Sequence, residues 1–253
     1  DAGPAEPASG SKGYNPERGA AVFRMVANFL DKHFALDRLA NNGALTDAVG
    51  RHSDVVEYCA VRGAGGAFRL QAKLGSGATV GLVTPSAFVG FNTGADGALS
   101  SVLLRHHGLH CELVIDRGDA IGSSHAAGLK DVLLESAMTT IADCEDSVSA
   151  VDAEDKAKVY RNWAGLMRGT LTAVLRKGGK ETLRVLAPDK SFVGAADGSA
   201  LVLPGRSLLL VRHVGLHMYT DAVRTAEGQA IPEGILDALV TAAAALHDVA
   251  GPV

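Results

Sequence analysis

The chain reads TTIADCEDSVSAVDAEDKAKVYRNW from Thr139 to Trp163. A short apolar strand is predicted over 139–142, and a polar helix is predicted over 152–166. A strand that leads into a helix is the building unit of parallel α/β sheets, so this stretch predicts an α/β fold. Between the two elements lies an acidic cluster made of Asp143, Glu145 and Asp146. Because carboxylates this close repel one another, the cluster indicates a site that handles a cation or a proton.

The acidic cluster also has a purely structural interpretation. Acidic and hydroxyl side chains at the start of a helix cap free N–H groups and interact favourably with the helix dipole. Asp146 and Ser147 fit that role. Asp143 and Glu145 instead follow a predicted buried strand, which is where barrel enzymes place their active sites. We therefore expect a functional role for at least one of these two acids.

A second strand–helix unit is predicted nearer the end of the chain. The apolar run SLLLV at 207–211 is typical of a strand buried on both faces, and an Ala-rich helix is predicted over 232–247. Arg212 follows the strand directly, and a buried cation is costly unless it meets an anion. It is either a structural ion-pair partner of the acidic cluster or a fixed cation that stabilises a developing oxyanion, and both interpretations stay open here. Arg184 alternates with apolar neighbours, which is typical of a solvated strand residue.

The rest of the chain follows a different pattern. Residues 49–125 consist of short apolar runs separated by Gly and Asp, which predicts antiparallel strands joined by tight turns. The other predicted elements are a helix from Pro16 to about His33, a helix over 129–138, and a hairpin of strands 183–186 and 200–203 around a turn at 196–198.

Composition narrows the class of function. The chain has 253 residues, 24 basic and 28 acidic, and no basic stripe, which argues against a nucleic-acid partner. Its apolar runs are too short to cross a bilayer, so no membrane association is expected. Cys59, Cys111 and Cys144 are widely spaced, which is typical of a reducing cytoplasm. The histidines near residue 107 fall on a predicted strand that does not converge them, so zinc is not expected.

Long stretches of the chain resemble malate synthase, specifically the long G isoform. They occur in the same order as in that family and cover nearly the whole chain, which makes the resemblance far more specific than a short motif. The stretches are GYNPERG (13–19), FVGFNTGA (88–95), HGLHCELVID (107–116), the run from LKDVLLES to AVDAEDK (129–156), YRNWAGLMRGTL (160–171), LPGRSLLLVRHVG (203–215) and IPEGILDAL (231–239).

The resemblance implies both a fold and an activity. These enzymes are transferases of the glyoxylate cycle that condense acetyl-CoA with glyoxylate to give malate and CoA, using Mg²⁺. They are expected to be cytoplasmic and monomeric. Their fold is a TIM (β/α)₈ barrel that carries an inserted α/β domain rich in antiparallel strands. The implied domains are 1–128 for the insertion, 129–170 for one barrel strand–helix unit, 171–205 for a return to the insertion, and 206–253 for a second strand–helix unit.

The resemblance also assigns roles to single residues. Arg212 resembles the active-site arginine that contacts glyoxylate and stabilises the enolate of acetyl-CoA. Ser147 and Arg184 resemble contacts to acetyl-CoA. Asp143 and Glu145 resemble residues that lie beside the Mg²⁺ site and bind its water molecules without touching the metal. Where the family has NVGHLM after the arginine, this chain has HVGLHM at 213–218.

The family pattern implies that other parts of the active site lie outside this chain. Its two carboxylate metal ligands, its catalytic Asp base and its CoA-binding Pro-rich segment are expected beyond Val253, and its first barrel strand before Asp1. The leading interpretation is therefore a malate synthase segment, inactive by itself and containing about two barrel strands. One alternative is a non-catalytic remnant that acts as a binding or interaction module. Another, a barrel lyase of the citryl- or malyl-CoA type, is disfavoured because the inserted domain matches the G isoform.

Overall fold

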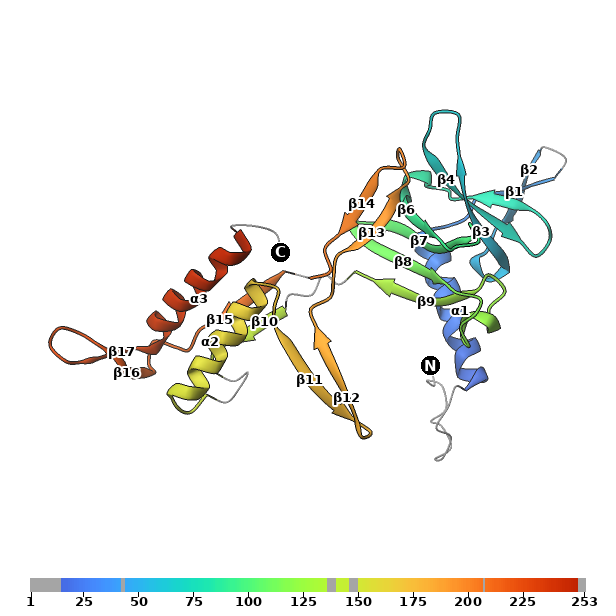
Figure 1. The fold of residues 1–253 in the computed structure, drawn as a ribbon. Helices are drawn as coiled ribbons and strands as arrows, with labels where there is room; N and C mark the ends of the chain where they lie inside the picture. The colour runs from blue at the N-terminus through green and yellow to red at the C-terminus, as the bar shows by residue number, and fades with distance from the viewer. Residues whose placement is uncertain (1–14, 42–43, 136–139, 146–149, 207, 250–253) are drawn as a thin grey trace. The chain divides into compact units, whose positions relative to one another are not determined.

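The computed structural model describes residues 15–41, 44–135, 140–145, 150–206 and 208–249. It is a mixed α/β structure with mostly antiparallel sheets, as Figure 1 shows. The chain forms two compact units and passes between them three times. Unit 1 comprises residues 1–137 and 191–202, and unit 2 comprises residues 138–190 and 203–253.

Unit 1 is built on an antiparallel six-stranded sheet of order β14-β13-β6-β7-β8-β9. Its strands are β6 (Phe88–Thr93), β7 (Leu99–His106), β8 (Leu109–Ile115), β9 (Leu129–Leu134), β13 (Lys190–Gly194) and β14 (Ala200–Leu203). A three-stranded sheet joins β3 (Val55–Arg62), β4 (Phe68–Leu74) and β5 (Thr79–Gly81), and β1 (Arg38–Asn41) pairs with β2 (Ala44–Val49). Short 3₁₀ turns lie at His52–Asp54, Pro85–Ala87 and Gly122–Ser124. The predicted antiparallel strands are thereby confirmed.

The helix α1 (Pro16–His33) begins and ends where the sequence predicts. The Asn15 side chain accepts hydrogen bonds from the N–H groups of Glu17 and Arg18, which would otherwise lack an intrahelical partner. Pro16 occupies the first turn, where its missing N–H costs nothing. The core of unit 1 joins this helix to both sheets, and its most enclosed side chains are Leu30, Leu36, Val55, Ala72, Val102, Leu104 and Leu113. No helix among the described residues is long and apolar enough to span a membrane.

The helix predicted over 129–138 is wrong for its described residues. Residues Leu129–Leu134 form strand β9, which extends the six-stranded sheet beyond β8 with Leu113 opposite Val132. Leu129 is buried and Lys130 is half-buried, so the strand enters the core at its first residues. A short apolar run fits either period, and here the hydrogen-bonding edge of β8 decides the outcome.

The predicted hairpin of 183–186 with 200–203 is also wrong in its partners. Residues Lys180–Val185 form β12, which pairs with β11 (Thr172–Lys177). The loop between them is Gly178-Gly179, and both residues have positive φ (58° and 78°), as a two-residue type I′ turn requires. The predicted turn around Gly198 exists, but it is β13 that leads into it, so β14 pairs with β13.

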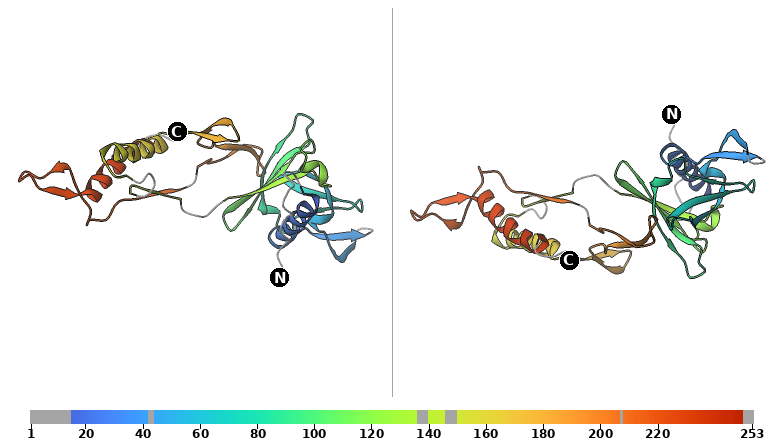
Figure 2. Two further views of the ribbon diagram at one scale, coloured as in Figure 1. Left: turned by 90° about the horizontal axis from the view of Figure 1, so that it is seen from below. Right: turned by 90° about the horizontal axis from the view of Figure 1, so that it is seen from above.

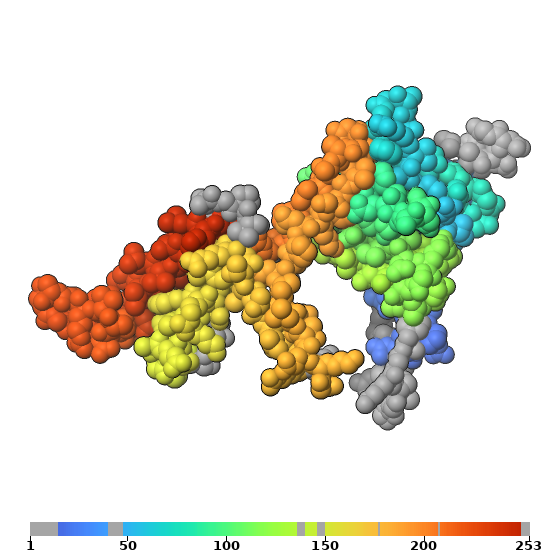
Figure 3. Space-filling model, in the orientation of Figure 1, coloured from blue at the N-terminus to red at the C-terminus, as the bar shows by residue number. Residues whose placement is uncertain are grey.

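Unit 2 contains the two predicted strand–helix units. Strand β10 (Thr140–Asp143) pairs in parallel with β15 (Leu209–Arg212), and helices α2 (Ala153–Met167) and α3 (Glu233–Val249) follow them in sequence. The two helices lie side by side, as Figure 3 shows. A further hairpin, β16 (Tyr219–Arg224) with β17 (Ala230–Pro232), precedes α3 and extends away from the helices in Figure 2.

The prediction that 207–211 is buried on both faces is not met by the described residues. Leu208 is 73% exposed and Leu210 is 49% exposed, and Ile141 on the paired strand is 61% exposed. Leu209 and Val211 are half-buried, so the strand alternates. β10 and β15 form a sheet of only two strands among the described residues, and these side chains on it are open to solvent.

His52 is a buried polar residue that makes unit 1 sensitive to pH. Its Nε2 lies 2.9 Å from the Phe34 carbonyl oxygen, and its Nδ1 lies 2.8 Å from the Tyr58 hydroxyl. Since a carbonyl only accepts, Nε2 carries the proton and Nδ1 accepts from Tyr58. Burial lowers the pKa of His52 below its usual value, although the Phe34 carbonyl and Asp31 oppose the shift.

We expect unit 1 to lose stability as the pH falls below about 6.5, because the unfolded chain then binds a proton that folded His52 does not bind. The loss approaches about 1.4 kcal/mol per pH unit down to the folded-state pKa. Amide-exchange protection of β7 and β8, corrected for the intrinsic exchange rate, measures it. His52→Gln should flatten this pH dependence. An equal slope in the parent and the variant would show that other groups cause it.

Candidate functional site

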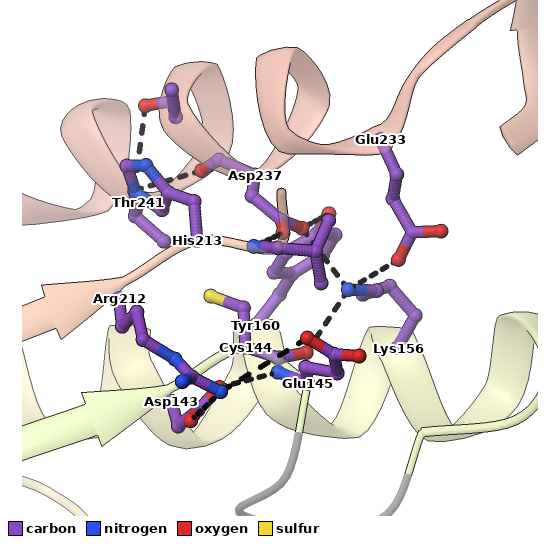
Figure 4. A network of polar contacts seen from close by, with 12 residues as sticks. Asp143, Cys144, Glu145, Lys156, Tyr160, Arg212, His213, Glu233, Asp237 and Thr241 are labelled. Carbon is purple, nitrogen blue, oxygen red and sulfur yellow. Dashed lines mark hydrogen bonds and ion pairs between the residues drawn. The ribbon is translucent and has the colours of Figure 1, made fainter. Parts of the chain in front are cut away.

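The candidate site lies in unit 2, where the two parallel strands end (Figure 4). The register pairs Asp143, the last residue of β10, with Arg212, the last residue of β15. An Arg212 Nη2 to Asp143 Oδ2 distance of 2.5 Å makes this a tight ion pair. The Arg212 side chain is still 53% exposed, whereas that of Asp143 is 20% exposed. A fixed, solvent-accessible guanidinium at the ends of two strands can bind an anion.

Glu145 completes the acidic side of the pair. Its backbone N–H donates to Asp143 Oδ1 at 2.8 Å, which fixes the Asp143 carboxylate from the side opposite to Arg212. Its own carboxylate lies 4.0 Å from Arg212 Nη2. The Cys144 N–H donates to the Arg212 carbonyl oxygen at 2.9 Å, so the strand ladder continues past the two ends. The structure thus brings together Asp143, Glu145 and Arg212.

The other predicted site residues are placed differently. Ser147 and Asp146 lie outside the described residues. Arg184 is exposed on β12, opposite Ala173 of β11. The helix that follows the acidic cluster is capped by Asp152, whose side chain accepts from the Asp155 N–H at 2.9 Å. Because α2 begins only at Ala153, Asp143 and Glu145 are not in its first turn and do not cap it.

Sequence reasoning missed a buried network that lies next to this pair. Lys156 on α2 uses its ammonium hydrogens on three oxygens, as Figure 4 shows. The acceptors are the Cys144 carbonyl oxygen at 3.0 Å, Asp237 Oδ1 at 3.2 Å, and the Glu233 carboxylate in a short ion pair. The Lys156 side chain is only 13% exposed and that of Asp237 is 0% exposed. The network therefore ties α2 and α3 to the segment that holds Asp143 and Glu145.

Asp237 is the centre of the network. Its Oδ1 also accepts from the Tyr160 hydroxyl at 2.6 Å, and its Oδ2 accepts from the Val214 N–H at 3.2 Å. Val214 lies two residues after Arg212. A buried carboxylate is tolerated only when it is paired and hydrogen-bonded, and both oxygens of Asp237 meet that condition.

A second set of contacts holds the residue between Arg212 and Val214. The Thr241 hydroxyl donates its one hydrogen to the Asp237 carbonyl oxygen at 2.7 Å. It therefore accepts from His213 Nε2–H, at 2.8 Å. The Trp163 indole N–H donates to the Thr241 carbonyl oxygen at 3.0 Å. His213 is thus fixed by α3.

The charges of the network shift the pKa values of its members. Burial lowers the pKa of Lys156, but the hydrogen bonds and charges of Glu233 and Asp237 outweigh it, so the net shift is upward. Burial raises the pKa of Tyr160, and the hydrogen bond to Asp237 adds to this. Burial, together with the charge of Asp237, raises the pKa of the Cys144 thiol to about 11. At neutral pH, Lys156 is therefore charged and the other two groups are neutral.

A signal for this network was present in the sequence. Lys156 and Tyr160 are four residues apart, as are Glu233 and Asp237, so each pair shares one helix face. Asp237 is also the one acid within the apolar run of α3 from Ile235 to Leu246. A lone acid in such a run indicates a buried partner, but the sequence does not say which helix supplies it.

The described residues do not provide a metal site of their own. No group of three His, Cys, Asp or Glu among them is placed to hold a metal ion. The Asp143 carboxylate is engaged by Arg212 and by the Glu145 N–H. Mg²⁺ prefers several oxygen ligands in octahedral geometry, and the pair alone does not offer that set.

Comparison with known proteins identifies the family. The family model described as the malate synthase G alpha-beta insertion domain matches residues 14–106. Malate synthase G of Halalkalibacterium halodurans is 46% identical over 235 residues, which cover 93% of this chain. The chain belongs to the malate synthase G family. Malate synthases G of Corynebacterium efficiens and Corynebacterium glutamicum are 42% and 40% identical, each over 94% of the chain.

The match covers a limited part of each malate synthase G. The aligned residues make up 30%, 29% and 30% of the length of the three relatives. The chain therefore spans less than a third of the malate synthase G proteins it matches. The insertion-domain match ends at residue 106 and falls within unit 1, whereas the Arg212 site lies in unit 2.

Proposed function

We propose that this chain contributes the enolate- and glyoxylate-binding arginine of a malate synthase, which condenses acetyl-CoA with glyoxylate to give malate and CoA in the glyoxylate cycle. The observation that carries the proposal is the ion pair of Arg212 with Asp143 at the matched ends of two parallel strands. Membership of the malate synthase G family supports it.

In the proposed reaction, Arg212 acts through charge and geometry. Removing a methyl proton from acetyl-CoA creates an enolate oxygen, and the Arg212 guanidinium offers fixed N–H donors to that oxygen and to glyoxylate. Asp143 holds the guanidinium in place, so little reorganisation is needed as the charge develops. Ser147 and Arg184 are proposed contacts to acetyl-CoA.

Parallel pairing of β10 and β15 also supports a barrel origin for unit 2. In (β/α)₈ barrels the site lies at the carboxyl ends of the strands, which is where Asp143 and Arg212 stand. We therefore propose that β10 with α2 and β15 with α3 are two strand–helix units of a TIM barrel, and that unit 1 is largely the inserted domain. The proposed enzyme is cytoplasmic and monomeric.

Mg²⁺ belongs to this proposal only through residues outside the chain. The described residues do not fit a complete magnesium site, so Asp143 and Glu145 are proposed to bind waters beside the metal. When bound, Mg²⁺ would polarise glyoxylate as an electrophile. The residues of this segment bind and orient the substrate.

A segment exchange tests the function. Residues 14–249 replace the corresponding segment of a full-length malate synthase G, and CoA release is followed with acetyl-CoA, glyoxylate and Mg²⁺. We expect turnover by the chimera within about tenfold of the parent, because the Arg212 site is intact. The isolated chain should give no turnover, because its described residues provide no metal site. A folded but inactive chimera would favour the alternative, a non-catalytic binding module; turnover by the isolated chain would refute the segment interpretation.

A further inference from the structure

One buried carboxylate, Asp237, holds the segment after Arg212 directly and the segment after Asp143 through Lys156. Its Oδ2 accepts from the Val214 N–H, two residues after Arg212. Its Oδ1 accepts from Lys156 Nζ, which in turn donates to the carbonyl oxygen of Cys144, between Asp143 and Glu145. One chain of contacts therefore links the segment that follows β15 to the segment that follows β10.

We propose that Asp237 and Lys156 are positioning residues that set the geometry of the Arg212–Asp143 pair; this inference rests on the function proposed above. Neither residue needs to touch a substrate. Asp237 is 0% exposed and Lys156 is 13% exposed, so both act through the backbone of the strand ends.

The strand ends need such an anchor because hydrogen bonds within the sheet are few there. Strands β10 and β15 pair over four residues each, and the ladder ends with the Cys144 N–H on the Arg212 carbonyl. Beyond that point the described contacts of 213 and 214 are made to α3, through Thr241 and Asp237. A small shift of α3 would therefore turn the backbone that carries Arg212, and misplacement of a reacting group is costly to the rate.

The anchor is specific because each of its hydrogen bonds is satisfied. Lys156 fills its three donors with Cys144, Asp237 and Glu233, and Asp237 fills both oxygens. A fully satisfied buried network holds one geometry. In Asp237→Asn, the amide NH₂ would face one of the donors that the carboxylate now accepts from, so one hydrogen bond is lost. The change is small in volume, so it tests the position of the strand ends rather than the packing.

The experiment is a double-mutant cycle in the full-length chimera. Asp237→Asn is made alone and in the Arg212→Lys background, with Asp248→Asn on the exposed end of α3 as the matched control. We expect Asp237→Asn alone to lower kcat about tenfold, with KM for both substrates changed less than threefold. In the Arg212→Lys background, Asp237→Asn should lower kcat less than twofold, because the planar guanidinium that Asp237 positions is no longer present. Asp248→Asn should leave kcat unchanged in both backgrounds.

The cycle also separates this inference from the function it rests on. If Arg212→Lys has no effect on kcat, the proposed function fails. If Arg212→Lys lowers kcat, but Asp237→Asn lowers kcat by the same factor in both backgrounds, only the positioning role is refuted. A lower melting temperature with unchanged kcat refutes it as well. Should Asp237→Asn not fold, the same cycle is read on Tyr160→Phe, which removes only the hydroxyl that donates to Asp237. Its expected loss is about threefold alone and none in the Arg212→Lys background.

Discussion

Arg212→Lys should lower kcat of the full-length chimera by about 10²–10³ while leaving its melting temperature within a few degrees. The substitution keeps the positive charge but removes the planar fork, and loss of one fixed oxyanion donor costs about 2.7–4 kcal/mol of transition-state stabilisation. Stability should change little because the side chain is 53% exposed and the ion pair lies partly in solvent.

Arg224→Lys is the matched control for this prediction. Arg224 is 54% exposed, also on a strand of unit 2, and forms an ion pair with Asp221 at 3.0 Å. Arg224 lies on the β16–β17 hairpin and not at the ends of β10 and β15. The Arg224→Lys variant should therefore keep the kcat of the parent. If the Arg212→Lys variant melts far lower yet keeps its kcat, Arg212 is a structural ion-pair partner only.

Lys156→Met should destabilise unit 2 by about 3–5 kcal/mol, the usual cost of removing one partner from a buried ion pair. The loss arises because Asp237, 0% exposed, and Glu233, 21% exposed, then face each other without a cation. Trp163 is the only tryptophan of the chain and is buried in unit 2. In a urea titration of the chain by itself, tryptophan fluorescence therefore reports on unit 2 alone.

Lys158→Met provides the control, since Lys158 is exposed on the same helix; its effect should be within about 0.5 kcal/mol. Adding Asp237→Asn to Lys156→Met should recover part of the loss, because the unpaired charge is then removed. The contrary outcome is additivity: Asp237→Asn lowers the free energy of unfolding by the same amount in the Lys156→Met background as in the parent. In that case an unpaired carboxylate is not the cause of the destabilisation.

The elements that the sequence predicted well carry strong local signals. Pro16 and Asn15 mark the start of α1, and the parallel strands β10 and β15 are short apolar runs followed by helices with clear periodicity. The same logic placed Asp143 and Arg212 at strand ends, and the register brings them together. Both the acid and the arginine stand at an identifiable boundary, so their positions were visible before any tertiary contact was known.

The errors arose where partners outside the segment decide the outcome. Leu129–Leu134 fits a helix by spacing, but the free edge of β8 makes it a strand. The strand predicted at 183–186 was expected to pair forward with 200–203, whereas the Gly178-Gly179 turn pairs the observed strand, Lys180–Val185, with the strand before it. Asp237 and Lys156 lie about eighty residues apart, and only packing of α2 against α3 joins them. No local pattern contains that information.

The interleaved path of the chain has a consequence for folding. Strand β6 pairs with β13, with Phe91 opposite Val193. The six-stranded sheet therefore cannot be completed until roughly a hundred further residues have been synthesised after β6. At common synthesis rates this interval lasts roughly 5–20 s. During it, the edge of β6 that later binds β13 presents unpaired N–H and C=O groups, a ready template for another extended segment. Capture of that edge by a wrong strand is therefore a misfolding route that this topology opens during synthesis.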